Sequence, residues 1–198
     1  MPRSFSELLQ QLATNSELQA TLLIVLVALA GVLYLLHLRI RRWRGDRATR
    51  KIIRRLGARS LQDLVLPDGT GGEVTIDHLL LAPDGLVIVN VMRFDGLIFG
   101  GRHTDQWTQV LGRKSYKFEN PNHYLQRQIN AIDLLVPDAP VSGRLLFSNA
   151  RFPKDKPDGV IVMGDLKSLP RRPRYRDIPG PVRTAWKQLQ ETMGRQTA

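Results

Sequence analysis

Residues 74–92 read VTIDHLLLAPDGLVIVNVM and contain two strand-like runs on either side of a short turn. Apolar and β-branched residues dominate 74–82 and again 86–92, as in strands of a folded sheet. Pro83, Asp84 and Gly85 between them are typical turn residues. Because so short a connection joins antiparallel strands, the segment predicts a β-hairpin.

The rest of the chain surrounds this hairpin with further strands and helices. The patterns predict a basic helix over 46–56 ended by Gly57, and a strand over 61–66. Helical spacing of apolar residues predicts a helix over 124–135. Shorter signals predict strands at 97–99, 107–118, 144–147 and 159–163, a linker at 168–181 and a helix at 182–193. This order favours an α/β or α+β domain with a mixed central sheet.

The amino-acid composition limits the kinds of metal site and of binding partner that this chain can have. The chain of 198 residues has no Cys, which excludes disulfides and thiolate metal sites. Its formal net charge of +11 suggests an anionic partner, either nucleic acid (DNA or RNA) or anionic lipid headgroups of a membrane bilayer. The charge alone does not separate these two partners.

A long apolar run near the N-terminus predicts a transmembrane helix. Residues 18–38 read LQATLLIVLVALAGVLYLLHL without a charged side chain, and as a helix they span roughly 30 Å, the thickness of a bilayer core. The run is followed by basic residues that we expect at the membrane surface: Arg39, Arg41, Arg42 and Arg44. Since basic residues stay on the cytoplasmic side, we expect a single-pass protein of the inner (plasma) membrane with a cytoplasmic C-terminal domain.

Several motifs in a fixed order resemble the nuclease-related domain family, known as NERD, within the PD-(D/E)xK nuclease superfamily. The matching pieces are IDH at 76–78, GLVIV at 85–89, DGLIFG at 95–100, Trp107, YKFENP at 116–121, LFS at 146–148 and FP at 152–153. The resemblance covers roughly 45–169. It implies a restriction-endonuclease-like fold, in which helices flank a mixed central sheet.

The resemblance also implies a metal-dependent nuclease site that this chain does not preserve. The family places an aspartate on one strand and Glu-x-Lys on the next, so that carboxylates hold a divalent cation. Asp77 retains the aspartate, but Asn90 and Met92 stand at the glutamate and lysine positions. Asp46 fits an acidic position in the first helix of the family, or alternatively caps a helix. Where the family has a glutamine, this chain has Tyr124, with Gln126 and Gln128 nearby.

We therefore expect a degenerate nuclease site that binds no cofactor. We expect Mg²⁺ or Mn²⁺ to bind only if the site is still active. Asp95 and Glu73 are the alternative carboxylates for a relocated site. We interpret Trp107 and Tyr116 as core aromatics. We expect nucleic acid to contact five residues, namely His78, Arg93, Arg113, Lys114 and Lys117. For His78, the alternatives are a structural role and a phosphate contact.

Three functions remain open from the sequence. They are a membrane-tethered nucleic-acid-binding module, an active nuclease with a relocated site, and a membrane scaffold whose arginines serve only lipid headgroups. The expected domain organisation is an amphipathic segment at 1–17, a transmembrane helix at 18–38, a basic juxtamembrane helix at 39–56, the NERD-like domain at 45–169, and a Pro/Arg-rich linker with a terminal helix at 170–198.

Overall fold

The computed structural model describes residues 16–196. The chain divides into two compact units between Arg44 and Gly45. Residues 1–15 of the amphipathic segment predicted at 1–17 lie outside the described residues, as do the side chains of Arg39, Arg41, Arg42 and Arg44. Among the described residues, no helix meets the length and hydropathy required to cross a bilayer.

The first described element is the long helix α2 (Ser16–Leu56). The two helices predicted at 18–38 and 46–56 are therefore parts of one continuous element, which ends before Gly57 as expected. Asp46 lies inside this helix, where its backbone carbonyl accepts a hydrogen bond from Arg50 Nε at 3.3 Å. The alternative interpretation of Asp46 as a helix cap is wrong, because the helix has no break at Gly45.

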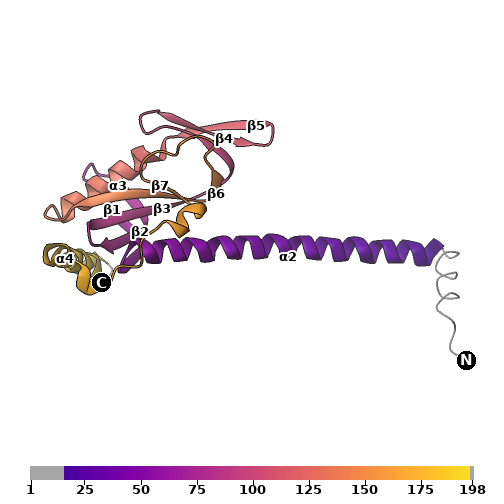
Figure 1. Cartoon of the computed structure of the whole chain (residues 1–198), viewed down its shortest axis with the longest axis horizontal. Helices are drawn as coiled ribbons and strands as arrows, with labels where there is room; N and C mark the ends of the chain where they lie inside the picture. Colours follow the sequence, from indigo (N-terminus) through magenta and orange to yellow (C-terminus); the bar gives the residue numbers. More distant parts are fainter. Residues whose placement is uncertain (1–15, 197–198) are drawn as a thin grey trace, which may run out of the picture. The chain divides into compact units, whose positions relative to one another are not determined.

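The second unit is built on a seven-stranded mixed sheet (Figure 1). Antiparallel pairing joins β1 (Arg59–Pro67), β2 (Glu73–Ala82) and β3 (Gly85–Phe99), and then β3, β4 (Gln106–Leu111) and β5 (Lys114–Glu119). Parallel pairing joins β3 to β6 (Val141–Arg151), and β6 to β7 (Val160–Val162). The predicted hairpin at 74–92 is the β2–β3 hairpin, and the expected mixed sheet is confirmed.

Strand β3 changes its neighbour along its length. Its first part pairs with β2 as far as Val89, and its last residues, 97–99, pair with β4. Along the other edge it stays paired with β6, although the register shifts between Met92 and Asp95. The stretch between Val89 and Leu97 therefore has no strand partner on the β2 side.

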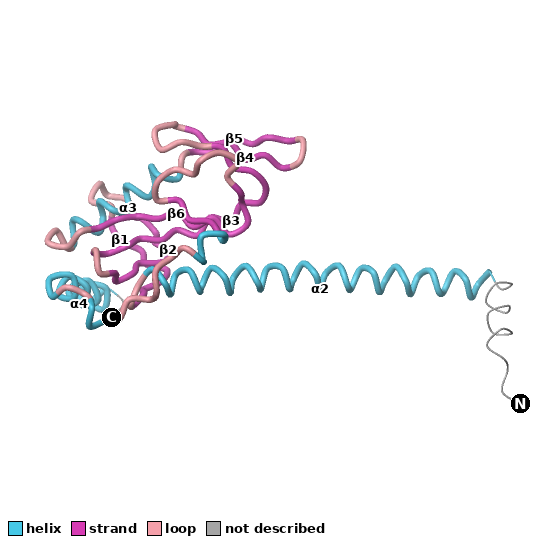
Figure 2. Tube along the Cα trace, in the orientation of Figure 1, coloured by secondary structure: helices cyan, strands magenta, loops and turns pink. Residues whose placement is uncertain are grey.

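Helices cover both faces of this sheet. The larger core lies under α3 (Pro121–Leu135) and α4 (Gly180–Gln196), and the smaller core lies under the last turns of α2 and the 3₁₀ helix η1 (Met163–Lys167). A second 3₁₀ helix, η2 (Tyr175–Asp177), precedes α4. In Figure 2 the strands lie between α3 and the C-terminal end of α2. Alternate residues of β3 explain this division, because Leu86 and Ile88 enter the larger core while Val87 and Val89 enter the smaller one.

Helix α4 is an integral part of the larger core. Val182, Ala185, Trp186 and Leu189 recur at helical spacing and are all buried. Ile178, just before the helix, is buried with them. The segment predicted as a linker and a terminal helix thus covers the sheet instead of merely following the domain.

We predict that Trp186→Ala lowers the free energy of unfolding by about 3–5 kcal/mol, because it leaves a cavity where a buried indole was. Urea denaturation of the full chain measures the effect. The exposed neighbour Lys187→Ala is the matched control and should change stability by less than about 0.5 kcal/mol. Equal effects of the two changes would contradict the packing of α4 described above.

Candidate functional site

The candidate site lies where β2 and β3 separate. The last pair between the two strands is His78 with Val89. One residue further, the carboxylate of Asp77 accepts a hydrogen bond from the backbone N–H of Val91 at 2.8 Å. A buried backbone N–H needs a partner, and here the side chain of Asp77 replaces the missing strand.

Asp77 opens onto a pocket of about 460 Å³ that we call the Asp77 pocket. Its lining residues are Asp63, Asp77, His78, Val91 and Arg93. Asp63 has a φ of 53°, and it is the one non-glycine residue with positive φ in the described part of the chain. Sequence reasoning missed Asp63, because a single aspartate in a predicted strand carries no signal of this backbone conformation.

The two other family positions lie in a different environment. Asn90 and Gln128 of α3 are buried, with 7% and 0% of their surfaces exposed. Asn90 Nδ2 donates to Gln128 Oε1 at 2.6 Å, and Gln128 Nε2 donates to Asn90 Oδ1 at 3.2 Å and also to the carbonyl of Thr75. Met92 packs against the larger core. Both residues of the family's Glu-x-Lys position are therefore used in packing and hydrogen bonding within the protein.

The structure does not bring the three family positions together on one face of the sheet. Asn90 and Met92 face the side of α3, whereas Val91 and Arg93 alternate with them and line the Asp77 pocket with Asp77. Asp77 lies beside residues 90–92, but its carboxylate is on the face of Val91 and Arg93. The reason is the irregular step at Asp77, since both Ile76 and Leu79 enter the larger core.

The other acidic candidates do not complete a metal site. Asp46, Glu73 and Asp95 are absent from the lining of the Asp77 pocket. Among the described residues, no group of three or more His, Asp or Glu side chains is arranged to hold a metal ion. Two carboxylates, from Asp63 and Asp77, beside the cationic Arg93 do not fit a Mg²⁺ site, which is normally built from several oxygen ligands.

His78 contributes the main electrostatic feature of the Asp77 pocket. Burial lowers the pKa of its imidazole below the ordinary value, while the nearby carboxylates of Asp77 and Asp63 oppose that shift. Its Nδ1 atom is buried and has no hydrogen-bond partner. The neutral imidazole is therefore the form that the folded protein favours.

The basic residues predicted to contact nucleic acid divide into two places. His78 and Arg93 line the Asp77 pocket, whereas Arg113, Lys114 and Lys117 lie on the β4–β5 hairpin. The three hairpin residues are exposed. In Figure 1 this hairpin lies on the opposite side of its unit from α4.

Two of the three aromatic residues of this hairpin, Trp107 and Tyr116, differ in their burial. Trp107 is buried, as expected, and its Nε1 donates to the carbonyl of Gly101 at 3.0 Å. Tyr116 is 48% exposed, so its interpretation as a core aromatic is wrong. Strand alternation places Tyr116 and Lys114 on the same face of β5.

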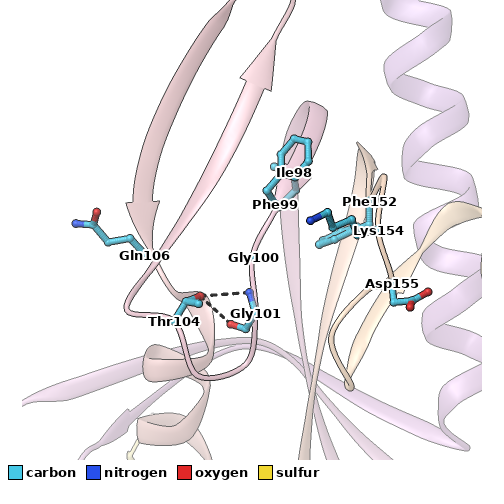
Figure 3. A pocket seen from close by; sticks show the side chains of 9 residues that line it. All are labelled: Ile98, Phe99, Gly100, Gly101, Thr104, Gln106, Phe152, Lys154 and Asp155. Carbon is cyan, nitrogen blue, oxygen red and sulfur yellow. Dashed lines mark hydrogen bonds between the residues drawn. The ribbon is translucent and has the colours of Figure 1, made fainter.

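A second pocket, of about 360 Å³, lies at the C-terminal end of β3 (Figure 3). Phe99, Phe152 and Lys154 line it, and the carboxylate of Asp155 points away from them in Figure 3. The loop at its base is held by Thr104 Oγ1, which accepts from the Gly101 N–H at 3.2 Å and donates to the Gly101 carbonyl at 3.0 Å. The pocket combines aromatic surface with an ammonium group.

Comparisons with known proteins agree with the resemblance seen in the sequence. Residues 41–148, just over half of the chain, match the family described as nuclease-related domain, NERD. An uncharacterized protein of Bacillus anthracis is 28% identical over 95 residues, which cover 46% of this chain and 45% of that protein. The chain thus matches slightly less than half the length of this curated relative. No solved structure matches the chain significantly.

We predict that Gln128→Met destabilises the protein by about 1–3 kcal/mol, because it leaves the buried amide of Asn90 without its partner. Adding Asn90→Leu to that variant should cost less than Asn90→Leu alone, since the two amides satisfy each other. A double-mutant cycle of urea denaturation measures this coupling. Strictly additive effects would show that the amide pair does not form.

We predict that His78 makes the folded state less stable as the solution becomes acidic. Because its folded pKa is lowered, the unfolded chain binds more protons below the unfolded value of about 6.5. The stability that neutral His78 provides is present above that pH and is lost as the pH falls toward and through the folded pKa. The slope of unfolding free energy between about pH 7 and 5 should be smaller in His78→Gln. An unchanged slope would contradict this assignment.

Proposed function

The chain belongs to the nuclease-related domain family, and we propose that it is a membrane-tethered, nucleic-acid-binding member whose nuclease site is degenerate. The match to a nuclease-related domain supports the part of this proposal that concerns the nuclease-like module.

The observation that carries the proposal is the buried amide pair of Asn90 and Gln128. Metal-dependent hydrolysis needs carboxylates that hold a cation, which in turn lowers the pKa of the attacking water. Asn90 offers only a neutral amide oxygen, and that oxygen already accepts from Gln128. Met92 supplies neither charge nor proton, so both groups expected from the family are lost.

The exposed β4–β5 hairpin is the favoured nucleic-acid surface. Arg113, Lys114 and Lys117 offer cationic groups for phosphates, and exposed Tyr116 offers a ring for stacking. The pocket beside β4, with Phe99 and Lys154, adds a second aromatic surface with a nearby cation. A base can stack on an aromatic face whatever its identity, so this combination suits single-stranded nucleic acid.

The apolar surface of α2 supports the membrane tether. Large apolar side chains between positions 23 and 36 are exposed on this helix, among them Leu23, Ile24 and Leu35. A contiguous exposed apolar surface of this kind favours an apolar environment over water. In this proposal the basic residues after position 38 contact anionic headgroups on the cytoplasmic side of the inner membrane.

We predict that the full chain, purified in a mild non-ionic detergent, binds a single-stranded DNA or RNA oligonucleotide with micromolar or weaker affinity that falls steeply with salt. Fluorescence anisotropy measures the binding. Arg113→Gln combined with Lys114→Gln should weaken it about tenfold at low salt, because two phosphate contacts are removed. The matched control is Arg171→Gln combined with Arg174→Gln, which removes the same charge from exposed positions outside the hairpin.

The same samples test the competing functions. Undetectable oligonucleotide binding at about 50 mM salt, together with firm binding to anionic vesicles, would replace the proposal with a membrane scaffold. With Mg²⁺ or Mn²⁺ added, we expect no cleavage of the oligonucleotide. Cleavage that disappears in Asp77→Ala would instead establish an active nuclease with a relocated site, for which Asp63 lines the same pocket as a second carboxylate.

A further inference from the structure

A large groove lies between α3 and the first residues of β6, apart from the Asp77 pocket. Its volume is about 640 Å³, which is within the range of small-molecule sites. The loop between β3 and β4 and the turn before β7 complete its walls. No residue lining this groove also lines the Asp77 pocket or the pocket at the end of β3.

Cationic and imidazole side chains gather around this groove from three different elements. Arg102 and His103 come from the β3–β4 loop, His123 from α3 and Arg144 from β6. Among the described residues, no carboxylate lies within ion-pair distance of Arg102, His103 or Arg144. Arg144 Nη1 donates a hydrogen bond to the neighbouring backbone carbonyl of Gly143, at 3.2 Å.

Two carboxylates lie nearby, but neither is within ion-pair distance of Arg102 or Arg144. Asp158 is exposed and lines the groove, and Glu119 lies 3.7 Å from Nδ1 of His123. The two arginines thus retain their charges for an external ligand. An arginine fork matches the oxygens of carboxylates and phosphates but not a halide. Because a phosphate group carries more negative charge than a carboxylate at neutral pH, the pair of arginines favours a phosphate group.

The loop that carries Arg102 and His103 is held in place by Asn120. The buried Asn120 donates through Nδ2 to the carbonyls of Gly101, Arg102 and Thr104, at 3.3, 3.2 and 2.7 Å. Its Oδ1 accepts from the N–H of Asn122 at 3.0 Å and thereby caps α3. Because this one residue joins the loop to the helix, the backbone that carries Arg102 and His103 is held in place before any ligand arrives.

The groove also has an apolar wall that a bare phosphate would not use. Leu125, Ile129 and Val141 line it beside the cationic groups. We propose that the groove binds a small phosphorylated ligand of the nucleotide class, with its phosphates on Arg102 and Arg144 and its planar base against the apolar wall. This site is separate from the proposed nucleic-acid surface and does not depend on that function.

Isothermal titration of the full chain in detergent with ATP, AMP and adenosine, without metal, tests the proposal. We expect ATP to bind with a dissociation constant below about 1 mM, AMP more weakly, and adenosine not at all, since the arginines recognise phosphate. Arg144→Gln should weaken ATP binding about tenfold or more. Thermal unfolding of the variant, with and without ATP, shows whether the loss of binding reflects misfolding.

Arg113→Gln is the matched control, because it removes the same charge from the β4–β5 hairpin. It should leave the affinity for ATP unchanged while weakening oligonucleotide binding. Equal weakening of ATP binding by Arg113→Gln and Arg144→Gln would overturn the proposal and leave only a general effect of net charge. Absence of ATP binding, or binding of adenosine as tight as that of AMP, would overturn it as well.

Discussion

The hydrogen bond between the Asp77 carboxylate and the backbone N–H of Val91 marks the place on which the rest of this domain depends. Strand β3 keeps β6 as its neighbour on one edge and exchanges β2 for β4 along the other. Backbone groups left between the two partners must still be satisfied. Asp77 satisfies Val91, and Gln109 Nε2 donates to the carbonyl of Asp95 at 2.8 Å. The Asp77 pocket lies where β2 separates from β3. From Leu97 onward, β4 of the β4–β5 hairpin takes the place of β2 beside β3.

The same geometry explains how an amide at position 90 is accommodated. The Gln128 amide offers both a hydrogen-bond donor and an acceptor to that position, and the Asn90 amide offers the complementary acceptor and donor. A carboxylate there would accept from Gln128 but would have no proton to donate in return, unless it were itself protonated. The buried pair therefore joins α3 to β3 through complementary neutral amides. A buried network of this kind is stable only when every polar group is paired.

Asn120 has a comparable role at the N-terminal end of α3. By capping the helix and bonding to three carbonyls of the β3–β4 loop, it connects that loop to α3. Gly100 lies beside this junction, where a Cβ atom would come within 2.2 Å of the Trp107 ring. The absence of a side chain lets the indole pack on the backbone, and the loop then separates the pocket at the end of β3 from the groove along α3.

The sequence alone determined the local elements and the family. The turn residues 83–85 and the apolar runs beside them specify the β2–β3 hairpin, and the helical spacing in 124–135 specifies α3, because both signals act between residues close in the chain. It also identified Asn90 and Met92 as departures from the family pattern. Only the tertiary structure placed Asp63 beside Asp77, turned Arg93 toward them and brought Gln128 to Asn90. These contacts depend on an irregular step in a strand and on packing between segments that are distant in the sequence. Neither can be predicted from the alternation of side chains along a regular strand.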